Sequence, residues 1–418
     1  MHLVPCQISS LLLGEPTTFD LFSQDGTLLA KTGHRFESGR ELARLTKDGA
    51  DVFIRFEDSK AGQEAEMRKM MLALVSEPAN SGDKSQASGS PAGAKSRAVK
   101  ETKSADQIRA ELDSEPDWPY LQEQAHAILS KRTNDLFLRQ IDRLVDKLSH
   151  YSQANPDGTL LVLIHLTSKD LERYSANHAV LVSVLCNIAA KEVLLWPDDL
   201  RKKLCCAAMT MNVGMTALQD QLALQPNPLT ELQRESIDLH AHQGAELLAT
   251  YGLQDKEWIE TVRGHHMQPA GPLAQRSLVE RFSRLIQRAD QFAAAISPRA
   301  TRKPITPSLA MKALYFDEQK QVDEAGAAII KAVGIYSPGS YVRLGSSETA
   351  VVVRRGANTA SPLVAVVLNR YNQPHNELTL RDTSKPEFRV LNSLAPQDVG
   401  ARLNIQRLMA LTKTRATA

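Results

Sequence analysis

The chain has 418 residues, more than one ordinary domain needs, so two or three domains are expected. Its 50 Lys and Arg residues against 48 Asp and Glu give a formal charge of +2, which offers no general electrostatic case for binding nucleic acid. The four cysteines form no Cys-x-x-Cys pair, and no apolar run approaches the roughly 20 residues that span a bilayer. With no signal-peptide pattern at the start, a soluble cytoplasmic bacterial protein with reduced thiols and no membrane span is expected.

The first 75 residues predict a small α+β module. Short β-type runs alternate with turn signals, among them the hairpin dipeptide Asp25-Gly26. Val52-Phe53-Ile54-Arg55-Phe56 predicts a further strand, and a helix is expected from about Ala61 to Val75. Residues 76–105 are rich in Ser, Ala, Gly, Lys and Pro and have almost no large apolar side chains, which is typical of a disordered linker.

Residues 106–335 predict an all-α domain. Apolar residues recur there with the 3.6-residue period of amphipathic helices, most clearly over residues 136–148, 179–189 and 278–289. Thr230 is expected to cap the start of another of these helices.

The pattern changes again in residues 336–418, which predict a β-rich extension and tail. After a turn at Pro338-Gly339, the segments Tyr341-Val342-Arg343-Leu344, Ala350-Val351-Val352-Val353 and residues 363–368 read as strands. The predicted fold class is therefore mainly α: a helical domain flanked by a small N-terminal α+β module and a small C-terminal β-rich region.

The helical domain contains the residues that are candidate metal ligands. His178, His240 and the pair His265-His266 are scattered through it, and Asp290 lies in an apolar helical run. Imidazole and carboxylate groups from separate helices are a common way for an all-α protein to build a metal site. In isolation, each of these histidines is more often a hydrogen-bonded core or surface residue, and the adjacent pair is more often solvated at a helix end.

In their order along the chain, these residues resemble the motifs of the HD-GYP domains, which are metal-dependent phosphodiesterases that hydrolyse cyclic di-GMP in bacteria. The resemblance runs from about Tyr174 to Phe316 and selects His240 over His242, because only His240 precedes a glycine by four residues. The other matching positions are His178 in the first-histidine helix, His265-His266-Met267 in place of His-His-Glu, and Asp290 as the late aspartate.

The chain departs from the family pattern at the His-Asp pair. Met211-Asn212-Val213-Gly214-Met215 stands where the family has His-Asp-x-Gly-Lys, and Ala270-Gly271-Pro272 stands where Gly-Tyr-Pro is expected. In the family the aspartate bridges metal ions, whereas Asn212 is neutral and its amide nitrogen does not coordinate. Met211 offers a soft thioether where Fe, Mn or Mg ions prefer imidazole or carboxylate. Met215 replaces a lysine whose ammonium could pair with phosphate.

The resemblance implies one set of metal ligands and one set of substrate contacts. The metal-ligand candidates, for one divalent Fe, Mn or Zn ion or for none, are His178, His240, His265, His266 and Asp290. The substrate-binding candidates are Gly271, Pro272, Arg299 and Arg302. Two alternatives stay open: Asp290 is an N-cap-like structural acid, and Met211, Met215 and Met267 pack the core of a collapsed site.

Three interpretations of function follow from the resemblance. In the first, the chain is a degenerate HD-GYP protein of cyclic di-GMP signalling, with a binding or regulatory role and with phosphodiesterase activity lost or weak. In the second, it is an active metal-dependent phosphodiesterase with a reduced metal site. In the third, it is a protein-interaction scaffold of the HD-output type. The expected partners are cyclic di-GMP or a related cyclic dinucleotide, and a signalling protein.

Overall fold

A computed structural model describes residues 3–6, 17, 20–35, 52–55, 116–130, 136–168, 171–268, 272–374, 378–401 and 403–413. The chain divides into two compact units, Met1–Val99 and Lys100–Ala418. The helix expected at residues 61–75, the linker expected at residues 76–105, and Gly271 lie outside the described residues. No helix in the described ranges is long and apolar enough to cross a membrane.

The first unit contains an antiparallel sheet with the strand order β1-β4-β2-β3. Its strands are β1 (Leu3–Cys6), β2 (Leu21–Phe22), β3 (Leu28–Ala30) and β4 (Val52–Arg55). The hairpin predicted at Asp25-Gly26 is confirmed, since these residues turn the chain between β2 and β3. Gly26 has a φ of 87°, a backbone conformation that side chains with a Cβ atom rarely adopt.

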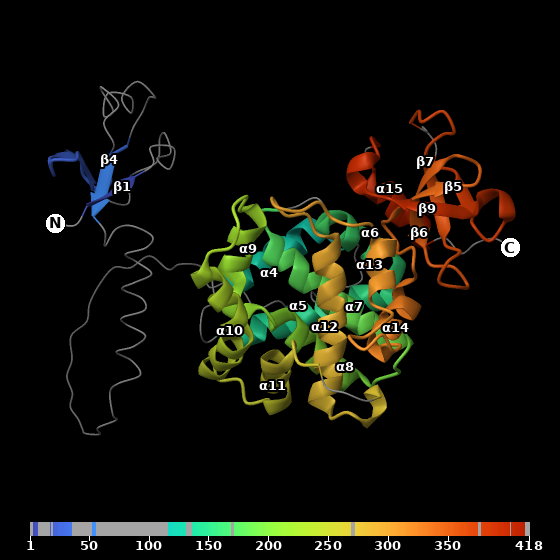
Figure 1. Cartoon of the computed structure of the whole chain (residues 1–418), viewed down its shortest axis with the longest axis horizontal. Coiled ribbons are helices and arrows are strands. Elements are labelled where there is room, and N and C mark those ends of the chain that lie inside the picture. Colours follow the sequence, from blue (N-terminus) through green and yellow to red (C-terminus); the bar gives the residue numbers. More distant parts are fainter. Residues whose placement is uncertain are drawn as a thin grey trace, which may run out of the picture. The chain divides into compact units, whose positions relative to one another are not determined.

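The second unit begins with a bundle of helices (Figure 1). The described helices are α4 (Trp118–Ser130), α5 (Phe137–Ala154), α6 (Pro156–Thr167), α7 (Tyr174–Glu192), α8 (Asp198–Thr210), η3 (Val213–Met215), α9 (Thr216–Leu224), α10 (Glu231–Thr250), α11 (Lys256–Gly264), η4 (Leu273–Gln275), α12 (Leu278–Ile296), α13 (Pro307–Ala313) and α14 (Glu324–Val333). Helix α7 is at the centre and contacts α4, α5, α6, α8, α12 and α14. Nearly all of its residues are buried, because its sequence is apolar on every side.

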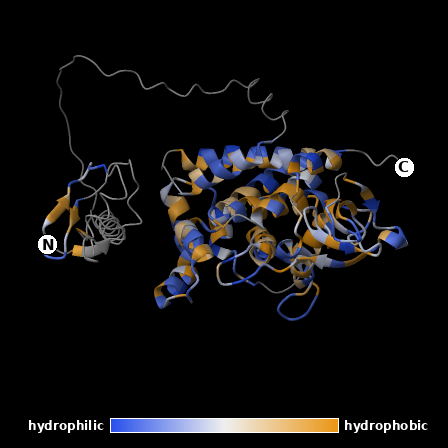
Figure 2. Ribbon diagram, turned by 90° about the horizontal axis from the view of Figure 1, so that it is seen from above, coloured by the Kyte–Doolittle hydropathy of each residue, from blue (hydrophilic) through white to orange (hydrophobic). Residues whose placement is uncertain are grey.

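The outer helices are amphipathic, and Figure 2 shows hydrophilic and hydrophobic residues along the same helices. In α5 and α12 the buried residues include Leu144, Leu148, Phe282 and Leu285, as their 3.6-residue period predicts. The cap predicted at Thr230 is confirmed: its hydroxyl accepts a hydrogen bond from the Gln233 backbone, and the Gln233 side chain accepts one from the Thr230 backbone.

The C-terminal region forms a five-stranded antiparallel sheet with the order β8-β7-β6-β5-β9. Its elements are β5 (Tyr341–Leu344), β6 (Thr349–Arg354), β7 (Leu363–Leu368), β8 (Leu380–Asp382), the short helices η5 (Pro386–Phe388) and η6 (Pro396–Asp398), β9 (Val390–Leu394) and α15 (Ile405–Lys413). The strands predicted from residues 341, 350 and 363 onward are confirmed, and so is the mainly α fold class with small sheets at both ends.

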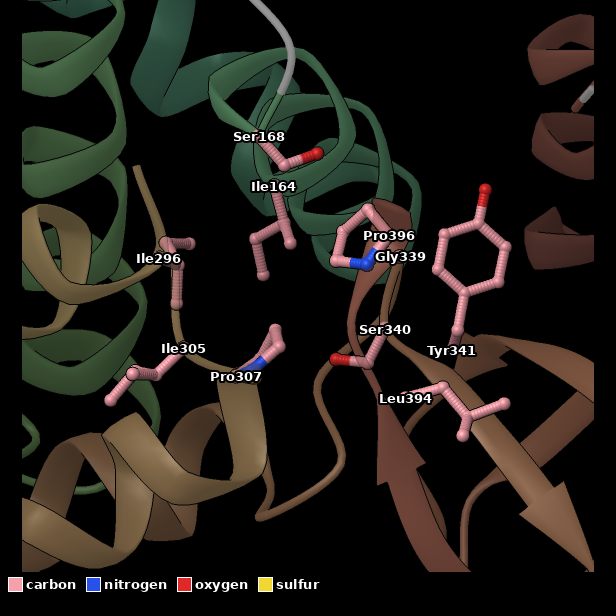
Figure 3. Close-up of a pocket in the computed structure, with 10 residues that line it drawn as sticks. All are labelled: Ile164, Ser168, Ile296, Ile305, Pro307, Gly339, Ser340, Tyr341, Leu394 and Pro396. Atoms are coloured by element: carbon pink, nitrogen blue, oxygen red, sulfur yellow. The ribbon is translucent and has the colours of Figure 1, made fainter. Parts of the chain in front are cut away.

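The C-terminal sheet packs directly on the helices. Arg355, just after β6, pairs with Asp157 of α6 and Glu192 of α7, each at 2.6 Å. Gly339 approaches α6 so closely that a Cβ atom would lie 2.8 Å from the carbonyl oxygen of Leu161. Figure 3 shows this junction, where Ile164 and its neighbours leave a cavity of only about 10 Å³. The helices and the C-terminal sheet therefore share one continuous packed interior.

Candidate functional site

Three histidines from two neighbouring helices meet in one cluster, which we call the histidine triad: His240, His265 and His266. His240 lies on α10, and His265 and His266 lie in the turn that ends α11. The Nε2 atom of His240 is 3.2 Å from Nε2 of His265 and 3.3 Å from Nε2 of His266. The side chains of His240 and His265 are buried, whereas His266 faces outward.

The backbone fixes which ring nitrogens of His240 and His265 carry protons. Nδ1 of His240 donates to the carbonyl oxygen of Ile237, and Nδ1 of His265 donates to that of Val262 at 2.6 Å. A carbonyl oxygen only accepts hydrogen bonds, so in the neutral rings the Nε2 atoms carry lone pairs. Two such lone pairs about 3.2 Å apart repel each other unless a proton or a cation lies between them. The donor set therefore fits a metal ion, and carbonyl-bound Nδ1 groups are the usual support for ligating histidines.

Burial keeps these rings neutral. It lowers the pKa of His240, and the hydrogen bond to Ile237 only partly offsets this. Burial also lowers the pKa of His265 to about 3, and the nearby His266 adds to the effect. Metal ligation requires the neutral imidazole, so both histidines are in the ligating form at neutral pH.

Two glycines bring His240 into place. A Cβ atom on Gly214 in η3 would lie 2.3 Å from the carbonyl oxygen of His240 and 2.8 Å from the Gly244 nitrogen. Gly244 itself packs against the Gly214 nitrogen and a methyl group of Val262. Helix α10 can thus approach both η3 and α11 because Gly214 and Gly244 have no Cβ atom at the points of contact.

The other two candidate ligands, His178 and Asp290, form a pair of their own. Nε2 of His178 on α7 lies 2.6 Å from Oδ1 of Asp290 on α12. Burial raises the pKa of Asp290, but the hydrogen bond from His178 and the charges of His178, His265 and His266 together outweigh it, so the pKa lies below its usual value. The ionised carboxylate only accepts, so Nε2 of His178 carries the proton in this pair. Its Nδ1 is buried and has no hydrogen-bond partner among the described residues.

Asp290 is paired with His178 in this arrangement, and the expectation that it resembles an N-cap is wrong. It lies well inside α12, which begins at Leu278 and is capped by Ser277. The charge of Asp290 also acts on His265, against the stronger lowering of the His265 pKa by burial. The pair and the triad are therefore close enough to interact electrostatically.

Tyr174 covers the His178 ring of the His178–Asp290 pair, and Arg299 binds Tyr174. The Tyr174 ring stacks on His178, with centroids 5.8 Å apart and planes 11° apart. Arg299 donates to the Tyr174 hydroxyl from Nη2 at 2.8 Å and from Nε at 3.2 Å. Arg302 instead donates to the carbonyl oxygen of Ala294. Arg299, a substrate-binding candidate, is thus engaged inside the protein, while Pro272 is exposed at the start of η4.

The residues at the replaced His-Asp pair have different environments. Met211 is fully buried in the main hydrophobic core, and Asn212 is half-buried just before η3. Met215 is half-buried, but Met267 is 63% exposed. The expectation that the methionines pack the core therefore describes Met211 and is wrong for Met267, which follows the exposed His266 in a turn outside α11.

Two further polar side chains lie near the triad. His242 is exposed and bonds to Glu246 at 2.9 Å, outside the cluster. Gln287 on α12 donates from Nε2 to the carbonyl oxygen of His266 at 3.2 Å, and its own oxygen accepts from Arg284. The signal for the Gln287 contacts was the three-residue spacing of Arg284, Gln287 and Asp290, which places polar groups on the buried face of an apolar helix.

The chain is similar to one domain family, to one named relative and to one solved structure. Residues 161–326 match the model of the HD domain family. A cyclic di-GMP phosphodiesterase of Pseudomonas aeruginosa is 28% identical over 234 residues, which cover 53% of this chain and 54% of the relative. The chain thus spans about half the length of that relative. A solved structure of a HDG"Y"P protein from Bdellovibrio bacteriovorus aligns over 78% of this chain and 98% of its own at 15% identity, with a TM-score of 0.39.

Proposed function

The chain belongs to the HD-GYP family of HD domains, and on that premise we propose that it is a degenerate member with phosphodiesterase activity lost or weak. Its role in this proposal is to bind or regulate within bacterial cyclic di-GMP signalling, in the cytoplasm. The ligand class comes from the relative named as a cyclic di-GMP phosphodiesterase. A cyclic dinucleotide and a signalling protein are the proposed partners.

The observation that carries the proposal is the pair Met211-Asn212. Hydrolysis at two metal ions needs both ions to be held about 4 Å apart, and a bridging carboxylate does this because it has two anionic oxygens. Asn212 is neutral, so it cannot replace the charge that such a bridge supplies. Met211 is fully buried in the core, where its thioether packs against apolar neighbours. The half of the site around these two residues lacks the ligands for a second ion.

The histidine triad supports binding of a single ion. Three imidazole nitrogens without a carboxylate suit Zn or Fe better than Mn, which prefers oxygen ligands. We assign His240, His265 and His266 as the holders of this ion, with His178 and Asp290 set aside as a pair. A bound ion of this kind would act as a Lewis acid and lower the pKa of a water molecule.

The second candidate function is an active phosphodiesterase with a reduced metal site. It is favoured by the same triad, because three converging imidazole nitrogens are more than a purely structural cluster requires. Asp290 has a lowered pKa, so its carboxylate is ionised and is a further acceptor near the triad.

One experiment separates these functions. The purified chain, loaded with Fe, Mn or Zn, is mixed with cyclic di-GMP, and binding heat and hydrolysis products are measured together. We expect binding without turnover. The double variant Met211→His with Asn212→Asp should raise the bound metal from about one ion to two and bring turnover. If the unaltered chain hydrolyses cyclic di-GMP and His265→Ala abolishes this turnover, the second function is established. If the chain binds no nucleotide at all, the role of a protein scaffold is favoured.

A further inference from the structure

Two side chains hold the backbone on either side of the segment that follows the histidine pair. At one end, the carbonyl oxygen of His266 accepts a hydrogen bond from Gln287. At the other, the backbone nitrogen of Leu273 donates to Oε2 of Glu324 at 2.6 Å. The backbone is therefore held by a side chain of α12 at His266 and by a side chain of α14 at Leu273.

Gln287 has no freedom to turn its amide over. It is 3% exposed, and its oxygen accepts from Nη1 of Arg284. Since the guanidinium only donates, the amide nitrogen must be the group that faces His266. Gln287 thus acts as a rigid link between Arg284 and the His266 backbone.

Arg284 is itself held by a buried ionic cluster. Its Nε and Nη2 atoms lie 2.8 and 2.6 Å from Oδ2 of Asp323, and Nη2 lies 2.8 Å from Oε2 of Glu318. Arg288 shares the same Asp323 oxygen at 3.1 Å. Asp323 also caps α14, accepting from the Gly326 nitrogen at 2.6 Å. Buried ion pairs of this kind add little net stability over apolar packing, so their value here is to fix a position.

His266 is the member of the triad that needs such a link. The Nδ1 atoms of His240 and His265 each bind a carbonyl of their own helix, which orients the rings. Among the described contacts, Nδ1 of His266 has no carbonyl partner of this kind, and its ring is exposed. The position of its Nε2 beside His240 therefore depends on its backbone.

We propose that Gln287 and Arg284 are positioning residues, which hold the His266 backbone so that its ring completes a metal site with His240 and His265. This rests on the proposed function, because it takes the triad to be the site of the ion. The chain of contacts runs from Asp323 through Arg284 and Gln287 to His266.

The test is Gln287→Met, which keeps the length of the side chain and removes its donor. Cobalt(II) is titrated into the whole, metal-free chain, and its visible absorption reports both affinity and ligand geometry. We expect cobalt affinity to fall by roughly 10-fold or more, the usual effect of removing a group that supports a ligand, with a changed spectrum. The matched control is Gln291→Met, one turn along the same helix, exposed and bonded to Arg288 instead; its cobalt affinity should stay as in the unaltered chain.

A second variant guards against a folding defect. Arg284→Lys keeps a positive charge beside Asp323 but lacks the branched group that also reaches Gln287, so it should weaken cobalt binding in the same direction. Cobalt binding by Gln287→Met with unchanged affinity and spectrum would overturn the positioning role while leaving the triad intact. If the unaltered chain takes up no cobalt, and His266→Ala changes nothing, the metal assignment is overturned and the positioning role with it.

Discussion

The candidate site has two halves, the histidine triad and the His178–Asp290 pair, which satisfy their buried polar groups in different ways. In the triad, the Nδ1 atoms of His240 and His265 are satisfied by backbone carbonyls, which leaves Nε2 lone pairs facing one another 3.2 Å apart. In the other half, Nε2 of His178 donates a hydrogen bond to Oδ1 of Asp290 at 2.6 Å. A residue of the right type at the right motif position is therefore not yet a ligand; the nitrogen that faces the other candidate ligands must also have an uncommitted lone pair.

The same contrast extends to the surroundings. The triad opens at the exposed His266, whereas the His178–Asp290 pair is covered by Tyr174, whose hydroxyl holds Arg299. Arg299 also lies over the Tyr174 ring, 5.1 Å from its centroid, so it is held by both parts of that side chain. In the triad an imidazole reaches the surface, whereas in the pair His178 is buried and only the Asp290 side chain, at 20%, is partly exposed.

The largest expected difference between the halves is in metal affinity. His265→Ala removes a ligand and leaves two imidazoles, so cobalt or zinc affinity should fall by more than roughly 100-fold, beyond the range for supporting groups. His178→Ala removes only the partner of Asp290 and should change the affinity by less than about threefold. Both are measured by metal titration of chelator-treated protein. An equal loss in the two variants would mean that the halves form one site.

Much of this contrast lay outside the reach of the sequence. The helices, the Thr230 cap and the C-terminal strands were predictable because they follow from periodicity and local side-chain chemistry. The motif order also placed His240, His265 and His266 in one group. The pairing of His178 with Asp290 joins residues 112 positions apart, and no local pattern reports which lone pair each will use. The contact of Gln287 with His266 was hidden for the same reason: the spacing places Gln287 on the buried face of α12, but it does not tell which residue 21 positions away lies beside it.

The second difference is in acid stability. Burial lowers the pKa of His265 to about 3, whereas a histidine in an unfolded chain has a pKa of about 6.5. Between these two pH values His265 is protonated in the unfolded chain but neutral in the folded chain, so protonation favours unfolding. The stability from this group is complete above pH 6.5 and is lost as the pH falls, by about 1.4 kcal/mol for each pH unit. His240 acts in the same direction, because burial also lowers its pKa.

Metal-free protein should therefore lose at least about 2 kcal/mol of unfolding free energy between pH 7 and pH 5. Denaturant unfolding in a chelator measures this. His265→Asn, which cannot titrate, should flatten the slope, whereas His242→Asn replaces an exposed histidine outside the triad and should leave it unchanged. A slope as steep in His265→Asn as in the unaltered chain would show that the triad does not carry the acid sensitivity.

The smallest expected effect is at the closed half. Tyr174→Phe keeps the ring that stacks on His178 but removes the hydroxyl that accepts two hydrogen bonds from Arg299. The unfolding free energy should fall by about 1 kcal/mol, because the half-exposed Arg299 recovers part of its hydrogen bonding from water. Cobalt affinity at the triad should not change, since Tyr174 contacts the triad through neither side chain nor backbone in the described contacts. A clear loss of cobalt affinity in this conservative variant would contradict the separation of the halves, because it would show that the stack on His178 transmits to the ion.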